Sequence, residues 1–222
     1  MKKTLLLLLF TATSVCAQQL QITNLRDALT LKNDLSNKYN AYNPDIKGTP
    51  FIHNKLEKIL LQGNAMKGKY NANQDYIELE RDGKIVFFLP AIEYPFEVKF
   101  VDQNSTYKAF EIEATKYGFF KILAAKEKAF LLCKEYVKLN AEVKPKSNFE
   151  IYKPAKFTRE KDTYFIKFKN QEIVIELPTK KSKFYKVFKG KENAIKTYIK
   201  KQRLNIKKSK DLIQIFNYYN TL

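Results

Sequence analysis

The sequence predicts an α+β fold, with an antiparallel β-sheet arranged as a sandwich or an open barrel-like sheet and a C-terminal subdomain of two or three helices. From residue 51 to 178, short segments of alternating apolar and polar residues follow one another without a helix-length segment between them. After residue 178 the apolar period becomes that of a helix. Hydrophobic residues make up 45% of the 222 positions, including 17 Phe and 14 Tyr, which is enough for a packed core.

The first segment, residues 1–17, predicts an export signal. Lys2 and Lys3 precede an apolar run, and small residues then lead to Ala17, after which we expect a signal peptidase to cleave. The run is shorter than the roughly 20 residues that span a bilayer, so we expect no membrane anchor. Cys16 leaves lipid attachment open as an alternative. We therefore predict an exported protein that is periplasmic or associated with the outer envelope.

Residues 18–50 are expected to be partly helical or irregular. Leu25, Ala28 and Leu29 have helical spacing, and the asparagine before them is placed to cap a short helix. Turn-forming Asn, Pro and Gly residues at 43–50 then mark the entry to the β body, which we place at 51–178.

Two hairpins stand out in the β body. The pair Asp82-Gly83 interrupts one alternating segment and permits the positive φ angles of a tight turn, and Asn170-Gln171 interrupts another. The buried faces are expected to carry Ile77, Leu79, Ile85, Phe87 and Leu89 in the first hairpin, and Tyr164, Ile166, Phe168, Ile173, Ile175 and Leu177 in the second. Lys167 and Lys169 should then face water.

Five further strands are predicted at 56–62, 97–101, 108–113, 118–124 and 129–139. The last of these is apolar on both faces. That pattern is typical of a central strand, because an edge strand with so much apolar surface would pair with other chains. Residues 143–156 contain two prolines and are expected to form a longer loop.

Three helices are predicted in the C-terminal subdomain, residues 179–222. Ser182 is placed to cap the first, Gly190 to end it, and Ser209 to cap the third. Their apolar stripes consist of Phe184, Val187 and Phe188, then Ile195, Tyr198 and Ile199, then Leu212, Ile215, Phe216 and Tyr219. These stripes need a partner, and we expect them to pack on the sheet.

The order of turns and core positions resembles a group of uncharacterised exported proteins of Gram-negative bacteria. The resemblance is carried by residues 48–51, 69–79 and 82–84, and by the Lys-rich helices with 211–213 and 218–220. It covers most of the mature chain. It implies a β-rich body with a Lys-rich helical tail and an envelope location, and it implies no activity and no ligand residues.

The charge balance favours anionic partners. Lys and Arg number 41 against 23 Asp and Glu, and a field of that sign attracts polyanions. For an exported protein these are anionic glycans, lipopolysaccharide or an anionic membrane surface. The excess of Lys over Arg argues against nucleic acid. The alternative is that the lysines only keep the protein surface solvated and bind no partner, and it explains the composition equally well.

The densest basic segment lies in the predicted helices, so we propose its side chains as candidate polyanion ligands. The candidates are Lys183, Lys186, Lys189, Lys200, Lys201, Arg203, Lys207 and Lys208. If the apolar stripes are buried, these side chains must point outward together. Other envelope proteins are the alternative partners, and the pattern predicts no oligomeric state.

We predict no catalytic, metal or cofactor site. His53 is the single histidine, so a histidine-rich zinc site is excluded. Once the leader is removed, Cys133 is the single cysteine, so no internal disulfide forms. A nucleophilic Cys133–His53 pair remains an alternative, against which the apolar neighbours of Cys133 argue. The 6 glycines show no phosphate-loop spacing.

The carboxylates give no catalytic pair. Glu78 with Glu80, and Glu111 with Glu113, are expected on solvated strand faces. Glu135 lies among apolar residues, so it must either be paired with a core Lys or Tyr or act as a functional acid. We therefore expect a structural or binding role. A hydrolase built around this glutamate or the cysteine is a further alternative.

Overall fold

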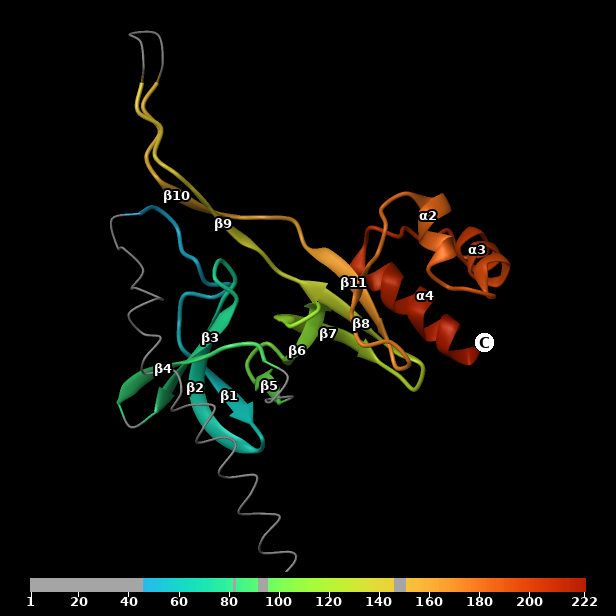
Figure 1. Ribbon diagram of the computed structural model, residues 1–222, viewed down its shortest axis with the longest axis horizontal. Helices are drawn as coiled ribbons and strands as arrows, with labels where there is room; N and C mark the ends of the chain where they lie inside the picture. The colour runs from blue at the N-terminus through green and yellow to red at the C-terminus, as the bar shows by residue number, and fades with distance from the viewer. Residues whose placement is uncertain (1–45, 82, 92–95, 146–150) are drawn as a thin grey trace, which may run out of the picture.

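The computed structural model describes residues 46–81, 83–91, 96–145 and 151–222 (Figure 1). Within them the chain forms a 10-stranded antiparallel sheet, a 2-stranded sheet and three C-terminal helices. The predicted α+β class is confirmed, and the large sheet does not close into a barrel. The predicted leader and the predicted helix near residues 25–29 lie outside the described residues.

The large sheet has the order β12-β11-β8-β7-β6-β5-β1-β2-β3-β4, and β9 pairs with β10 in the small sheet. The strands are β1 (Glu57–Leu61), β2 (Asn64–Asn71), β3 (Tyr76–Arg81), β4 (Lys84–Phe88), β5 (Glu97–Phe100), β6 (Ser105–Glu113), β7 (Lys116–Ala125), β8 (Ala129–Lys134), β9 (Val137–Asn140), β10 (Lys156–Arg159), β11 (Thr163–Phe168) and β12 (Ile175–Glu176). The helices are α2 (Lys181–Lys186), α3 (Glu192–Lys201) and α4 (Ser209–Thr221).

The first half of the large sheet surrounds one hydrophobic core. Its fully buried members include Ile59, Leu61, Ile77, Leu79, Phe88, Val98 and Phe119. The turn between β2 and β3 reaches the distant half of the chain, because Val137 N donates to Ala72 O at 3.2 Å and Asn73 Nδ2 donates to Val137 O at 3.0 Å. The sheet therefore bends so that its early strands contact β7 and the start of β9.

Strands β2 and β10 are not revealed by the sequence pattern, and β2 shows why. Its eight residues are mostly polar or small, and they form a strand because β1 and β3 pair with them on both sides. Gly68 permits the close approach of β3, since a Cβ there would lie 2.7 Å from Glu78 O. Pairing with neighbours, not local pattern, determines this strand.

The hairpin of β3 and β4 is confirmed, but the predicted buried face of β4 is wrong. Arg81 pairs with Lys84, so odd-numbered residues of β3 oppose even-numbered residues of β4, and Ile77 lies opposite Phe88. Phe88 is buried, whereas Ile85 is 45% exposed. Across the two-residue loop, the buried positions change from odd-numbered residues in β3 to even-numbered residues in β4. The prediction kept odd-numbered residues buried in both strands.

The hairpin of β11 and β12 also exists, with a longer connection than predicted. Ile173 is 44% exposed and forms a parallel bridge with Glu111 of β6, so the returning strand begins only at Ile175. Lys167 does not simply face water. It is half-buried, and its Nζ donates to Phe168 O at 3.1 Å.

The strand predicted at 129–139 is divided. It leaves the large sheet after Lys134, and β9 pairs instead with β10 in an arm that projects from the body (Figure 1). Part of the loop predicted at 143–156 belongs to this arm, where Val143 and Lys153 form an antiparallel bridge. Among the described residues of the arm, the exposed apolar side chains include Leu139, Val143, Ile151 and Tyr152.

The three helices pack on the sheet as predicted. Their apolar side chains share one core with Ala129, Leu131 and Ile166 of β8 and β11, and α4 lies against β7 and β8 (Figure 1). The predicted caps are wrong: the N-cap residues of α2 and α4 are Lys180 and Lys208, and neither forms a side-chain cap bond. Packing of the apolar stripes therefore stabilises these helices.

In the described part of the chain, every helix is too short or too polar to cross a membrane.

Candidate functional site

A basic pocket lies where the connection between β11 and β12 meets α2 and α4. It has a volume of about 400 Å³. Its lining residues are Phe168, Asn170, Gln171, Ile175, Lys183, Lys186, Val187, Lys189 and Tyr219. Lys183 and Lys186 belong to α2 and Lys189 follows it, so three lysines of one short segment line the pocket.

The aromatic part of the lining is held by packing. The rings of Phe168 and Tyr219 meet edge to face with their centroids 5.9 Å apart, and Phe188 packs on Tyr219 at 5.0 Å. Burial raises the pKa of Tyr219, so its hydroxyl stays neutral at physiological pH and is able to donate a hydrogen bond. The wall is therefore a preformed surface that combines an apolar face with a polar donor.

Two amide side chains complete the polar lining. Asn170 is exposed at the hairpin connection, and Gln171 beside it is half-buried. The buried Gln171 Oε1 has no hydrogen-bond partner among the described residues. A buried acceptor without a partner is unfavourable, so this oxygen lacks a donor that the described residues do not supply.

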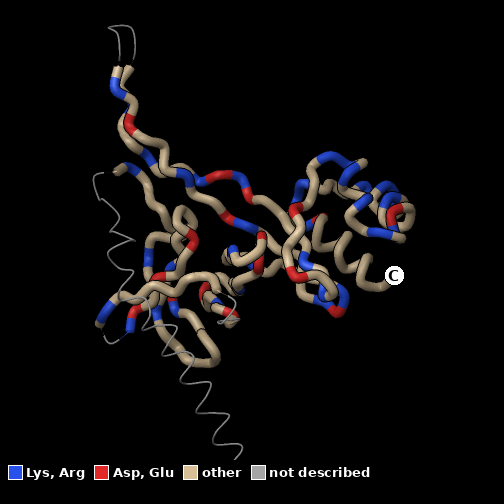
Figure 2. The backbone as a smooth tube through the Cα atoms, viewed as in Figure 1, with Lys and Arg blue, Asp and Glu red and all other residues tan. Residues whose placement is uncertain are grey.

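The electrostatic surroundings of the pocket are strongly positive. From residue 180 to the end, thirteen Lys and Arg residues stand against two acidic residues, and all thirteen side chains are exposed. Figure 2 shows these basic residues along α2, α3 and the connections around them. None of the thirteen forms an ion pair with a carboxylate of the described residues. Their charge remains available to an anionic partner.

The structure brings together some of the predicted basic residues and separates the rest. Lys183, Lys186 and Lys189 share the basic pocket. Lys207 lines a different pocket beside β11, which also contains Asp162 and Glu176. The remaining predicted residues, Lys200, Lys201, Arg203 and Lys208, line neither pocket. Sequence reasoning missed Asn170, Gln171 and Tyr219, because only the tertiary fold brings them to the lysines.

Glu135, the buried carboxylate, is fully engaged. Tyr107 donates its hydroxyl hydrogen bond to Glu135 Oε2, and Arg159 Nη2 lies 3.2 Å from Glu135 Oε1. The prediction that this carboxylate pairs with a core Lys or Tyr is confirmed. Both oxygens of Glu135 therefore have partners within the protein, at the point where β8 ends.

Lys134, the residue before Glu135, is also buried, and it has different partners. Its Nζ lies 2.5 Å from Asp75 Oδ2 and donates to Phe119 O at 2.8 Å, while Tyr70 donates to Asp75 Oδ1 at 2.7 Å. Burial lowers the pKa of Lys134, and Asp75 opposes that shift. Gly118 makes room for the pair, since a Cβ there would lie 2.9 Å from Asp75 Oδ2.

The alternative nucleophilic pair is not brought together. Cys133 lies in β8, where burial raises the pKa of its thiol and Asp162 and Glu135 raise it further. A thiol with a raised pKa is a poor nucleophile. His53 instead lines a pocket with Glu57 and Asp102.

The carboxylates on the strands are paired with lysines. Glu78 lies 3.0 Å from Lys69 Nζ, and Glu80 lies 3.8 Å from Lys67 Nζ, in both cases across β2 and β3. Glu113 lies 4.0 Å from Lys116 Nζ. These carboxylates belong to cross-strand and turn ion pairs.

Alkaline pH is expected to reveal the contribution of the buried tyrosines. Burial raises the pKa of Tyr70 and Tyr107, and the carboxylates of Asp75 and Glu135 raise them further. The unfolded chain loses these protons near pH 10 whereas the folded chain keeps them, so stability is retained below about pH 10 and falls as the pH rises above it. We expect Tyr107→Phe to reduce that fall.

At neutral pH the same substitution should lower the free energy of unfolding by about 1–3 kcal/mol, because Glu135 loses a buried donor. Urea unfolding at a series of pH values measures both effects. Equal alkaline slopes in the wild-type protein and Tyr107→Phe would contradict the assignment.

No family model matches this chain, and no curated protein or solved structure shows a significant similarity to it.

Proposed function

We propose that this protein is exported to the cell envelope and binds an anionic glycan in the basic pocket. The predicted leader supports export, and the excess of exposed, unpaired basic side chains at the C-terminal end supports an anionic partner. The observation that carries the proposal is the convergence of Lys183, Lys186 and Lys189 on one pocket that also offers amide groups and an aromatic wall.

Each part of the pocket matches a part of such a ligand. Ammonium groups neutralise sulfate, phosphate or carboxylate groups, and lysine binds them as a point charge. The unpartnered Gln171 Oε1 and the Asn170 amide match sugar hydroxyls. The edge-to-face pair of Phe168 and Tyr219 presents an apolar surface for the face of a sugar ring. A pocket of about 400 Å³ accepts one or two sugar units.

The test is a titration of the purified protein with a heparin fragment, a sulfated glycan, and with dextran as the uncharged glycan. We expect binding of the heparin fragment that weakens as salt is added, and no binding of dextran. The variant Lys183→Gln, Lys186→Gln, Lys189→Gln should lose affinity by about threefold to 150-fold, given roughly 0.2–1 kcal/mol for each of the three exposed charge contacts.

The matched control is Lys200→Gln, Lys201→Gln, Lys208→Gln. It removes the same charge from side chains that are also exposed but lie outside the pocket. We expect a loss of affinity of less than about threefold in the control, from the long-range field alone. Equal losses in the two variants would show that diffuse charge, not the pocket, binds the glycan, and an unchanged affinity in the pocket variant would overturn the proposal.

A further inference from the structure

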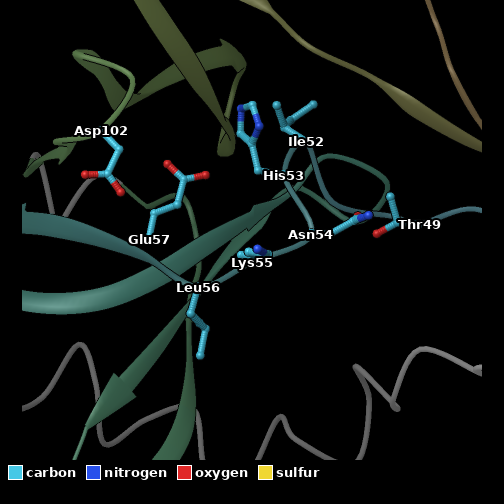
Figure 3. A pocket seen from close by; sticks show the side chains of 8 residues that line it. All are labelled: Thr49, Ile52, His53, Asn54, Lys55, Leu56, Glu57 and Asp102. Carbon is cyan, nitrogen blue, oxygen red and sulfur yellow. The ribbon is translucent and has the colours of Figure 1, made fainter.

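A second pocket lies beside β5 and β1, several strands away from β11 and β12, where the segment before β1 faces the turn after β5. Figure 3 shows its lining side chains, which are Thr49, Ile52, His53, Asn54, Lys55, Leu56, Glu57 and Asp102. Its volume is about 600 Å³, within the range of small-molecule sites. Glu57 is the first residue of β1, and Asp102 follows β5, so two adjacent strands hold the two carboxylates in place.

Glu57 is the unusual group in this pocket. Its residue is 8% exposed, and Oε1 accepts a hydrogen bond from Gln103 Nε2 at 2.7 Å. The other oxygen, Oε2, is buried and has no hydrogen-bond partner among the described residues. In Figure 3 the carboxylate of Glu57 lies between His53 and Asp102. A buried carboxylate oxygen without a donor costs free energy, so the fold holds an acceptor in the pocket that the described residues do not satisfy.

The charged groups around Glu57 indicate which kind of ligand would supply the hydrogen bond that Oε2 lacks. Burial raises the pKa of Glu57, His53 lowers it, and Asp102 raises it again, so the two carboxylates repel each other across the pocket. A bound positive charge with several N–H donors relieves that repulsion and supplies the missing hydrogen bond. The described residues contain no cluster of three or more His, Cys, Asp or Glu side chains suited to a metal ion.

We propose that this pocket binds the protonated primary amine of a small ligand, with Glu57 Oε2 and the Asp102 carboxylate as its acceptors. An ammonium group has three donors, and the hydroxyl of Thr49 and the side-chain oxygen of Asn54 provide further acceptors in the lining. Amino sugars and the α-amino group of amino acids or peptides both carry this group. The proposal concerns a pocket separate from the basic pocket and does not depend on glycan binding there.

His53 makes the test direct, because it is the single histidine in the chain and lines the pocket. Its imidazole proton resonances can be followed by NMR while the protein is titrated at neutral pH with glucosamine or with glycine methyl ester. The controls are N-acetylglucosamine and N-acetylglycine methyl ester, which keep the size and lack the charge. We expect a saturable shift with the amines and none with the acetylated compounds. If glucosamine binds more tightly, the natural ligand is an amino sugar. If glycine methyl ester binds more tightly, the ligand is the α-amino group of an amino acid or peptide.

Glu57→Gln keeps the shape of the side chain and the hydrogen bond with Gln103, and it removes the charge. We expect it to lose the saturable shift, with affinity reduced at least tenfold, while its melting temperature does not fall. Glu127→Gln is the matched control, since this glutamate is exposed and lies outside the pocket. We expect it to bind as the wild-type protein does.

Equal shifts with amines and acetylated compounds would overturn the proposal, as would unchanged binding by Glu57→Gln. Heparin binding is measured on the same variants, so a failure at this pocket is distinguished from a failure at the basic pocket.

Discussion

Replacing Lys134 with alanine is expected to lower the free energy of unfolding by about 3–5 kcal/mol. The ammonium group is buried, lies 2.5 Å from Asp75 Oδ2 and donates to Phe119 O at 2.8 Å. Without it, the carboxylate of Asp75 loses its cation and the carbonyl loses its donor inside the protein. Equilibrium unfolding in urea, followed by circular dichroism, measures the change.

Two further variants separate the ion pair from the loss of a lysine side chain. Lys126→Ala removes an exposed lysine at the end of β7 and should change the free energy of unfolding by less than about 0.5 kcal/mol. The double variant Asp75→Asn, Lys134→Met removes both charges and should cost much less than Lys134→Ala alone, because no unpaired charge remains buried. If Lys134→Ala costs no more than Lys126→Ala, the buried pair does not stabilise the fold.

The size of this effect reflects where the pair lies. Asp75 belongs to the turn between β2 and β3, and besides Lys134 it accepts hydrogen bonds from Tyr70 and from the backbone N–H of Phe119. The turn between β2 and β3 and the consecutive strands β7 and β8 therefore meet at one carboxylate. The bend of the large sheet depends on this junction, since the early strands contact β7 and β8 there.

The sequence pattern predicts this junction only in part. Alternation correctly locates most strands, because one face of each strand is buried. It identifies Glu135 as a buried carboxylate that needs a partner, and the structure supplies Tyr107 and Arg159. It does not reveal that Lys134 is buried too, because a lysine at the end of a strand is usually exposed. The same junction divides the predicted strand 129–139.

The sequence pattern predicts more of the basic pocket than of the second pocket. The lysines of the basic pocket are visible as a dense basic segment whose apolar stripe forces them outward. Its amide groups and Tyr219 come from distant segments, so only the packing of α4 against the sheet brings them near. At the second pocket, Glu57 and Asp102 are 45 positions apart, and the pairing of β1 with β5 brings them together.

The other large effect is expected at Phe188, which links the helices to the sheet. Its ring is 2% exposed and packs on Phe184 at 5.4 Å and on Tyr219 at 5.0 Å, within the core shared with β8 and β11. We expect Phe188→Ala to lower the free energy of unfolding by about 3–5 kcal/mol, because it removes a large buried side chain and leaves a cavity. Phe188→Leu fills most of that space and should cost clearly less.

This variant also tests whether the helices and the sheet unfold together. The predicted boundary at residue 178 makes residues 179–222 a separate subdomain, yet their apolar side chains are buried against Ala129, Leu131 and Ile166 of the sheet. A shared core favours one cooperative transition. Circular dichroism reports on the helices, and the His53 resonance reports on the half of the sheet that contains β1. We expect Phe188→Ala to lower the urea midpoint of unfolding by the same amount in both signals. A shift in the helical signal alone would mean that the C-terminal helices form an independent unit, because the sheet would then hold its structure without them.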